Sequence, residues 1–221
     1  MSEYILPAPT NNIESGRLDH QHEIFIRTLG SLNKAPLDTS KPLKVLDIGC
    51  GNGNWTMLSR LNTRKLTFQQ ASAESADSWD SLQDRFDFIH GRMIMVFVRS
   101  WPNLLKRCYD KLTPGGWIEI QDLQFPLQCL GESAVTAKCR TLQWSDGLVK
   151  GMQMAGVSPA GAMQFAYILP RLGFVDVSLE DRQMLFGEWP ESEEDKELAE
   201  WGWRTSDWAR EGGRGCCSRR F

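Results

Sequence analysis

The sequence predicts an α/β fold with a mostly parallel sheet covered by helices on both faces. Short apolar segments alternate with longer segments of helical periodicity, and glycine-rich sequence directly follows the first apolar segment. A length of 221 residues suits one such domain. We expect an extended lead-in over residues 1–13, the domain over 14–190, and an acidic, then disordered, tail over 191–221.

The first elements follow from periodicity. Apolar or neutral side chains recur every three or four positions over residues 14–32, which predicts an amphipathic helix with one buried face. They are Leu18, His22, Phe25, Leu29 and Leu32. Residues 43–48 are short, branched and largely apolar, as is typical of a buried parallel strand, and a helix is expected from Asn54.

The same alternation continues along the chain. Further strands are expected at residues 66–70, 86–90, 117–121 and 174–179. An amphipathic helix is expected over 101–112, with Trp101, Leu104, Leu105, Cys108 and Leu112 on its apolar face. A helical lid is expected over 132–156, and another helix over 159–172 with Gly173 as its C-cap.

Composition excludes several classes of function. The formal charge of −3 provides no basic field for nucleic acid. No apolar run reaches the roughly 20 residues of a membrane span. The six cysteines form no CxxC pair, so we expect no metal site and reduced thiols. We therefore expect a cytoplasmic protein, with the nucleus as an open alternative.

Three glycines at alternate positions lie between the first strand and the following helix. In the stretch from Asp47 to Gly53, Gly49, Gly51 and Gly53 let the backbone approach a bulky ligand, with Cys50 between them. A dinucleotide motif has the spacing GxGxxG and binds pyrophosphate, whereas an acid before GxGxG repels phosphate and attracts an ammonium group. The motif thus favours S-adenosylmethionine over NAD, and the alternative is a tight turn without a ligand.

Two later segments add candidates at the same edge of the sheet. Ser72, Ala73 and Glu74 could hold an adenine, although Ser72 could instead cap a helix. His90 could act as a base, or serve structure alone, and Arg92 could pair with the carboxylate of the cofactor or form a surface ion pair. His22, in the polar start of the first helix, is the other candidate proton acceptor.

The chain resembles the fungal LaeA-like methyltransferases. The resemblance runs from Tyr4 to Trp189 through VLDIGCGNGNW, FDFIHGRM, WPNLLKRCYDKLTPGGWIEIQD and LGFVDV. It implies a seven-stranded, Rossmann-like class I methyltransferase fold with S-adenosylmethionine at the first glycine loop and no metal. It also implies that Asp47, Gly49, Gly51 and Gly53 line the cofactor, with Ala73 and Glu74 beside its adenine.

The chain departs from that family pattern in two places. Only NWTMLSRLNTRKL separates the glycine loop from FQQASAE, so a second strand, its helix and the acid that holds the ribose hydroxyls are missing. The ending GGRGCCSRRF stands where the family continues to a final strand. We therefore expect a fold lacking one βα unit and the final strand, through either a mispredicted exon boundary or a degenerate paralogue.

The function predicted is methyl transfer from S-adenosylmethionine to a small molecule, as in fungal secondary metabolism. Holding the nucleophile and the methyl group in line can supply about 7 to 11 kcal/mol without a dedicated base. The alternative is a catalytically impaired protein with a regulatory or interaction role, which the missing acid favours. An NAD-linked oxidoreductase is a third possibility, although it too would need the missing acid.

Overall fold

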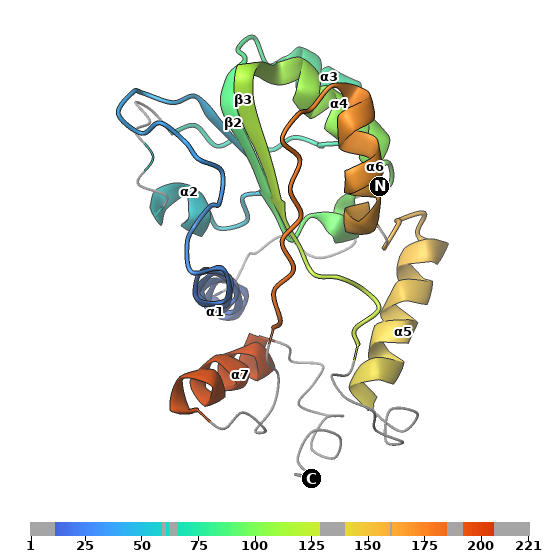
Figure 1. Cartoon of the computed structure of the whole chain (residues 1–221). Helices are drawn as coiled ribbons and strands as arrows, with labels where there is room; N and C mark the ends of the chain where they lie inside the picture. Colours follow the sequence, from blue (N-terminus) through green and yellow to red (C-terminus); the bar gives the residue numbers. More distant parts are fainter. Residues whose placement is uncertain are drawn as a thin grey trace. The chain divides into compact units, whose positions relative to one another are not determined.

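The computed structural model describes residues 12–58, 61, 66–128, 140–159, 161–184 and 192–205 (Figure 1). These residues belong to two compact units, each with its own contacts. The first unit contains residues 33–124 and 152–179, and the second contains residues 12–32, 125–151 and 180–205. The predicted lead-in over 1–13 lies almost wholly outside the described residues.

The first unit is built on a three-stranded parallel sheet. The strands are β1 (Val45–Ile48), β2 (Phe86–Arg92) and β3 (Leu112–Gln121), in the order β1-β2-β3. The pairing between β2 and β3 shifts register between Phe86 and Phe88. Parallel strands joined by helices confirm the Rossmann-like α/β class predicted from the sequence.

The two faces of this sheet differ in polarity. Side chains alternate along a strand, so the register places Leu46, Ile48, Ile89, Ile118 and Ile120 on one face. The other face carries Val45, Asp47, Phe88, His90, Arg92, Trp117, Glu119 and Gln121. Helix α2 (Asn54–Leu58) and helix α4 (Trp101–Lys111) lie on opposite sides of the sheet (Figure 1).

Helix α4 confirms the predicted apolar face. Trp101, Leu104, Leu105, Cys108 and Leu112 are all buried. Helix α6 (Gly161–Leu172) packs on α4, with Phe165 edge-on to Trp101 at 4.7 Å between ring centroids. Gly173 ends α6 with φ +103°, as expected for a C-cap. Two short elements complete the unit, α3 (Ala76–Asp80) and the 3₁₀ turn η1 (Met95–Phe97).

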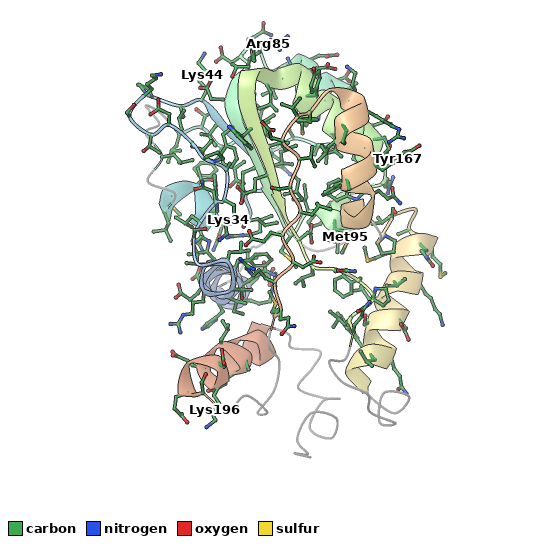
Figure 2. All side chains as sticks on the ribbon, viewed as in Figure 1. Lys34, Lys44, Arg85, Met95, Tyr167 and Lys196 are labelled. Atoms are coloured by element: carbon green, nitrogen blue, oxygen red, sulfur yellow. The ribbon has the colours of Figure 1, made fainter. Side chains whose placement is uncertain are left out.

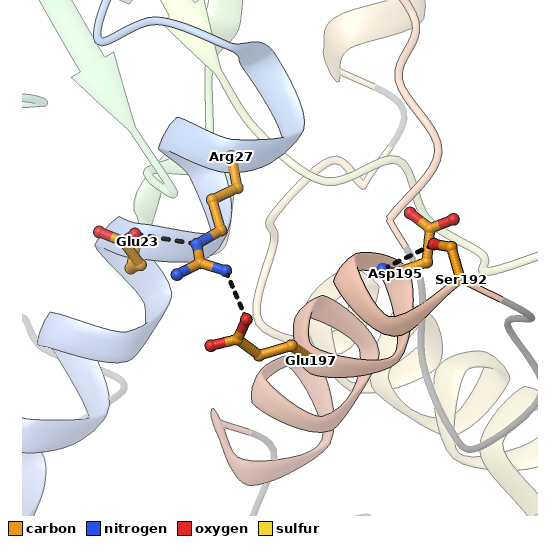
Figure 3. Close-up of polar contacts among 5 residues, drawn as sticks. All are labelled: Glu23, Arg27, Ser192, Asp195 and Glu197. Carbon is orange, nitrogen blue, oxygen red and sulfur yellow. Dashed lines mark hydrogen bonds and ion pairs between the residues drawn. The ribbon is translucent and has the colours of Figure 1, made fainter.

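The second unit contains α1 (Asn12–Leu29), most of α5 (Arg140–Met154) and α7 (Glu193–Thr205). Helices α1 and α7 pack together. Arg27 on α1 pairs with Glu23 at 2.9 Å and with Glu197 of α7 at 3.2 Å (Figure 3). The Ser192 hydroxyl accepts a hydrogen bond from the Asp195 N–H at the start of α7 (Figure 3).

Two predicted strands are wrong. Residues 66–70 are irregular and pair with no strand of the described sheet, although β1 is an edge strand of that sheet. All five side chains are exposed, so the segment lacks the buried face that favours a strand. Residues 174–179 are also irregular, since Asp176 has φ +52° and cannot continue an extended backbone. The ring of Phe174 instead packs edge-on against Tyr109 at 5.1 Å between centroids.

Helix boundaries in the second unit also differ from expectation. Helix α1 ends at Leu29 rather than Leu32, because Gly30 turns the chain with φ +71°. Helix α7 lies in the acidic part of the tail, where no element was predicted, and residues 206–221 lie outside the described residues. Helix α5 occupies residues 140–154 of the segment expected as a helical lid, residues 132–139 are not described, and the role of a lid stays a prediction. Within the described chain, no helix has the length and apolar character needed to cross a membrane.

Candidate functional site

The carboxyl ends of the three parallel strands meet at one edge of the sheet. The glycine loop, residues 49–53, follows β1; Arg92 ends β2; and Asp122 directly follows β3. In Figure 2 the labelled Lys44 and Arg85 mark the amino edge, and Met95 lies toward the opposite end of the strands. The fold thus brings the glycine loop together with the HGR segment, as predicted.

All three motif glycines have a left-handed backbone. The φ angles of Gly49, Gly51 and Gly53 are +66°, +58° and +83°, which disfavour any residue with a Cβ. The Gly53 N–H donates to the Cys50 carbonyl at 2.8 Å and closes the loop. Helix α2 then begins at once, with the Met57 N–H donating to the Gly53 carbonyl.

Protein side chains fill the space beside two of these glycines. A Cβ on Gly49 would lie 2.9 Å from Ile94 Cγ2, so Gly49 is needed for packing as well as for the turn. A Cβ on Gly53 would lie 3.1 Å from the ring of Phe68. Gly51 is exposed and forms the open part of the loop. The tight-turn alternative therefore explains Gly49 without a ligand, whereas Gly51 is open to one.

Asp47 lies behind the loop rather than at the mouth of a pocket. Its side chain is 7% exposed. The Oδ1 atom contacts His90 Nδ1 at 2.8 Å, and Oδ2 accepts a hydrogen bond from the Thr56 hydroxyl at 2.7 Å. With both oxygens bonded to protein, Asp47 holds β1, β2 and α2 together. A direct contact with the cofactor stays a prediction.

His90 is completely buried and oriented by two neighbours. Its imidazole stacks on Trp55 of α2, with ring centroids 3.7 Å apart and an angle of 8° between the planes. Because the Asp47 carboxylate accepts from Nδ1, the hydrogen-bond network assigns the proton of a neutral imidazole to Nδ1. Nε2 is then an acceptor, and it has no hydrogen-bond partner among the described residues.

Glu119 extends this arrangement across the sheet, and the sequence analysis missed it. The register aligns Asp47, His90 and Glu119 in one row over the three strands. Glu119 Oε2 accepts from the backbone N–H groups of Lys34 and Ala35, both at 2.8 Å. The alternation of Trp117, Glu119 and Gln121 along a strand was the available signal, but it could not reveal the partners.

The charges beside the loop are partly shielded from water. Burial lowers the pKa of Arg92 to about 10, against the effect of the Asp47 carboxylate, which raises it. Arg92 is therefore still cationic at neutral pH. Burial, with the nearby Asp47 carboxylate, raises the pKa of the Cys50 thiol, so Cys50 stays an uncharged thiol at neutral pH. The predicted roles of both residues in cofactor binding stay predictions.

The predicted adenine segment has structural partners. Glu74 Oε1 accepts from the N–H groups of Arg99 and Ser100, at 2.5 and 3.1 Å, at the start of α4. The Ala73 carbonyl accepts from Trp79 Nε1 at 2.8 Å, and the Ser72 hydroxyl accepts from the Glu74 N–H at 3.3 Å. The alternative role of Ser72 as a helix N-cap is wrong, because Ser75 occupies that position of α3.

Asp122 is a second acid that the sequence analysis missed. Its carboxylate accepts from the N–H groups of Met95 and Leu123, at 2.8 and 2.9 Å, and so joins the exit of β3 to the turn that follows β2. Burial raises the pKa of Asp122 to about 6, although these backbone hydrogen bonds act in the opposite direction. Part of the folded population therefore carries a proton on Asp122 near pH 6.

We expect Asp122→Asn to change how stability depends on pH. The folded pKa lies above the ordinary value of 3.8, so the contribution of Asp122 to stability is complete below about pH 4 and is lost as the pH rises through about 6. The free energy of unfolding of the wild type, relative to that of the variant, should fall by on the order of 2 kcal/mol between pH 4 and pH 7. Urea unfolding at both pH values measures it, and parallel pH profiles would contradict it.

The remaining candidates lie elsewhere or are untested. His22 is buried on α1, in the second unit, and its role as a proton acceptor stays a prediction. Among the described residues, no three His, Cys, Asp or Glu side chains gather as a metal site would require. The expectation of a metal-free site rests on the sequence.

Comparison with known proteins identifies the family of the chain. The family model described as a methyltransferase domain matches residues 20–207. Methyltransferase cpsF of Aspergillus campestris is 30% identical over 211 residues, covering 80% of this chain and 72% of its own. The secondary metabolism regulator LAE1 of Cochliobolus heterostrophus is 26% identical, covering 87% of this chain and 70% of its own. Methyltransferase pytC of Aspergillus terreus is 26% identical, covering 86% and 64%. The chain therefore belongs to the methyltransferase-domain family, in its group of fungal LaeA-like, secondary-metabolism proteins.

Proposed function

We propose that the chain binds S-adenosylmethionine at the 49–53 loop and transfers its methyl group to a small molecule. The observation that carries the proposal is the loop itself. Three left-handed glycines directly follow a parallel strand at the carboxyl edge of the sheet, where ligands of α/β folds bind. Membership of the methyltransferase-domain family supports the same ligand.

The charge behind the loop fits a cationic ligand. The Asp47 carboxylate acts on Cys50 within the loop, where it contributes to the raised thiol pKa. The same negative potential favours a sulfonium and an ammonium group and disfavours a pyrophosphate. Arg92 supplies a positive charge nearby that suits the carboxylate of an amino acid. This arrangement supports S-adenosylmethionine over NAD.

In this proposal the described residues bind the cofactor and hold the glycine loop in position. S-adenosylmethionine supplies an activated methyl group when it is bound. The loop backbone provides the binding surface, and Asp47, Thr56 and His90 fix the loop on the sheet. Because His90 is completely buried, we assign it a positioning role rather than that of a general base. Holding the nucleophile and the methyl group in line can accelerate the transfer without a general base, which is consistent with this site.

Two glycine variants test the proposal. Gly51 and Gly115 are both exposed and have φ +58° and +78°. Gly115 lies within β3, in the irregular stretch between Leu112 and Trp117 at the amino edge of the sheet, away from the loop. Alanine at either position should destabilise the fold by a similar amount, about 1 kcal/mol. We expect Gly51→Ala to weaken S-adenosylmethionine binding about tenfold or more in calorimetry, and Gly115→Ala to leave it unchanged. Equal affinities of the two variants would argue against the loop as the binding site.

A noncatalytic role is the second candidate. Relatives include proteins named secondary metabolism regulators, and the Glu74 carboxylate is engaged with α4 rather than open to a ligand. A protein that keeps the fold to interact with partners would need no cofactor. No binding of S-adenosylmethionine by folded protein at millimolar ligand would favour this role over the enzyme.

A further inference from the structure

Phe68 contacts the glycine loop at its third glycine. Ring atoms Cε1 and Cζ lie 3.1 Å from the point where a Cβ on Gly53 would stand, and Met57 Cε lies 3.7 Å from it. The sequence analysis placed Phe68 in a strand leading to the adenine segment. In the structure it instead lies on an irregular segment and covers Gly53, which is buried.

This contact leaves no room for a ligand between Phe68 and Gly53. A Cβ stands about 1.5 Å from its Cα, so the ring lies within about 5 Å of the Gly53 backbone. A flat ligand between two groups needs about 3.5 Å on each side, or about 7 Å in all. A ligand can therefore lie against Gly53 only after the ring of Phe68 has moved.

The ring is weakly held. Phe68 is 59% exposed, and all residues from Leu66 to Ala71 are exposed as well. Moving the ring therefore gives up only part of the apolar burial of a phenylalanine, and breaks no regular secondary structure.

We propose that Phe68 competes with the ligand for the glycine loop, so that an adenosyl ligand binds only when the ring leaves Gly53. This inference rests on the proposed function, because it concerns the same loop. The affinity of the free protein is then lower than the affinity of the open loop by the cost of displacing the ring. Phe68 thus determines affinity without being part of the family glycine motif.

Substitution of Phe68 tests the proposal through the direction in which the affinity for the ligand changes. Phe68→Ala removes the competitor, so we expect it to bind S-adenosylhomocysteine and S-adenosylmethionine about fivefold more tightly than wild type, equivalent to about 1 kcal/mol. Phe68→Trp should bind more weakly than wild type, because a larger ring is displaced. Leu66→Ala, on the same exposed segment, is the control and should leave affinity unchanged.

The outcomes separate this inference from the proposed function. Isothermal calorimetry of each folded variant gives the dissociation constants. Tighter binding by Phe68→Ala, including binding where wild type shows none, supports the inference. Binding by both proteins, with Phe68→Ala equal or weaker, means that Phe68 is neutral or stacks on the ligand; it overturns the inference and leaves the proposed function standing. Binding by neither protein overturns both.

Discussion

Replacing Asp47 with alanine should lower the free energy of unfolding by about 3 kcal/mol or more. The change leaves Nδ1 of the buried His90 without its acceptor, and Thr56 without its 2.7 Å partner. Leaving buried polar groups unpaired costs about 1–3 kcal/mol each. The midpoint of urea unfolding measures the loss.

Asp47→Asn is the matched control, because it preserves size and can preserve both contacts. Its carbonyl oxygen can accept from His90 Nδ1, and its amide can donate to the Thr56 oxygen after the hydroxyl rotates. We expect it to lose less than half as much stability as Asp47→Ala, while its missing charge weakens S-adenosylmethionine binding severalfold. Equal destabilisation by both variants would show that the carboxylate charge, rather than the hydrogen bonds, stabilises this cluster.

The sequence predicted those parts of the fold that depend on local patterns. The buried stripe from Trp101 to Leu112 needs only helical periodicity, and all its members are buried. The strands at 45–48 and 86–92 are short and apolar, and the glycine loop follows the first of them as predicted. These elements are specified within a few neighbouring residues.

The sequence did not predict features that depend on partners distant in the chain. Residues 66–70 have strand composition, but a strand also needs a partner and a buried face, and nothing local shows that this segment stays exposed and outside the described sheet. The roles of Asp47 and Glu74 were assigned to a ligand, whereas protein groups from 9 to 43 positions away occupy their oxygens. Spacing reveals a candidate acid, but not whether groups of the folded chain already occupy its oxygens.

Trp55 is the residue through which the glycine loop is attached to the sheet. Helix α2 has five residues, too few to be stable alone, and Trp55 is its one buried member. The indole stacks on His90 and lies 5.9 Å, between ring centroids, from Phe88. The position of α2, and hence of the preceding loop, therefore depends on this side chain.

We expect Trp55→Ala to lower the free energy of unfolding by about 3–5 kcal/mol, as for large aromatic side chains in other cores, and to abolish measurable S-adenosylmethionine binding. Phe165→Ala is the matched control, since Phe165 is also buried but packs on Trp101 in the α4–α6 layer. Both variants should unfold at lower urea concentration, but only Trp55→Ala should lose the ligand. Because the two losses of stability are comparable, retained binding by folded Trp55→Ala would show that the loop keeps its conformation without α2, and loss of binding by both would trace affinity to global stability instead.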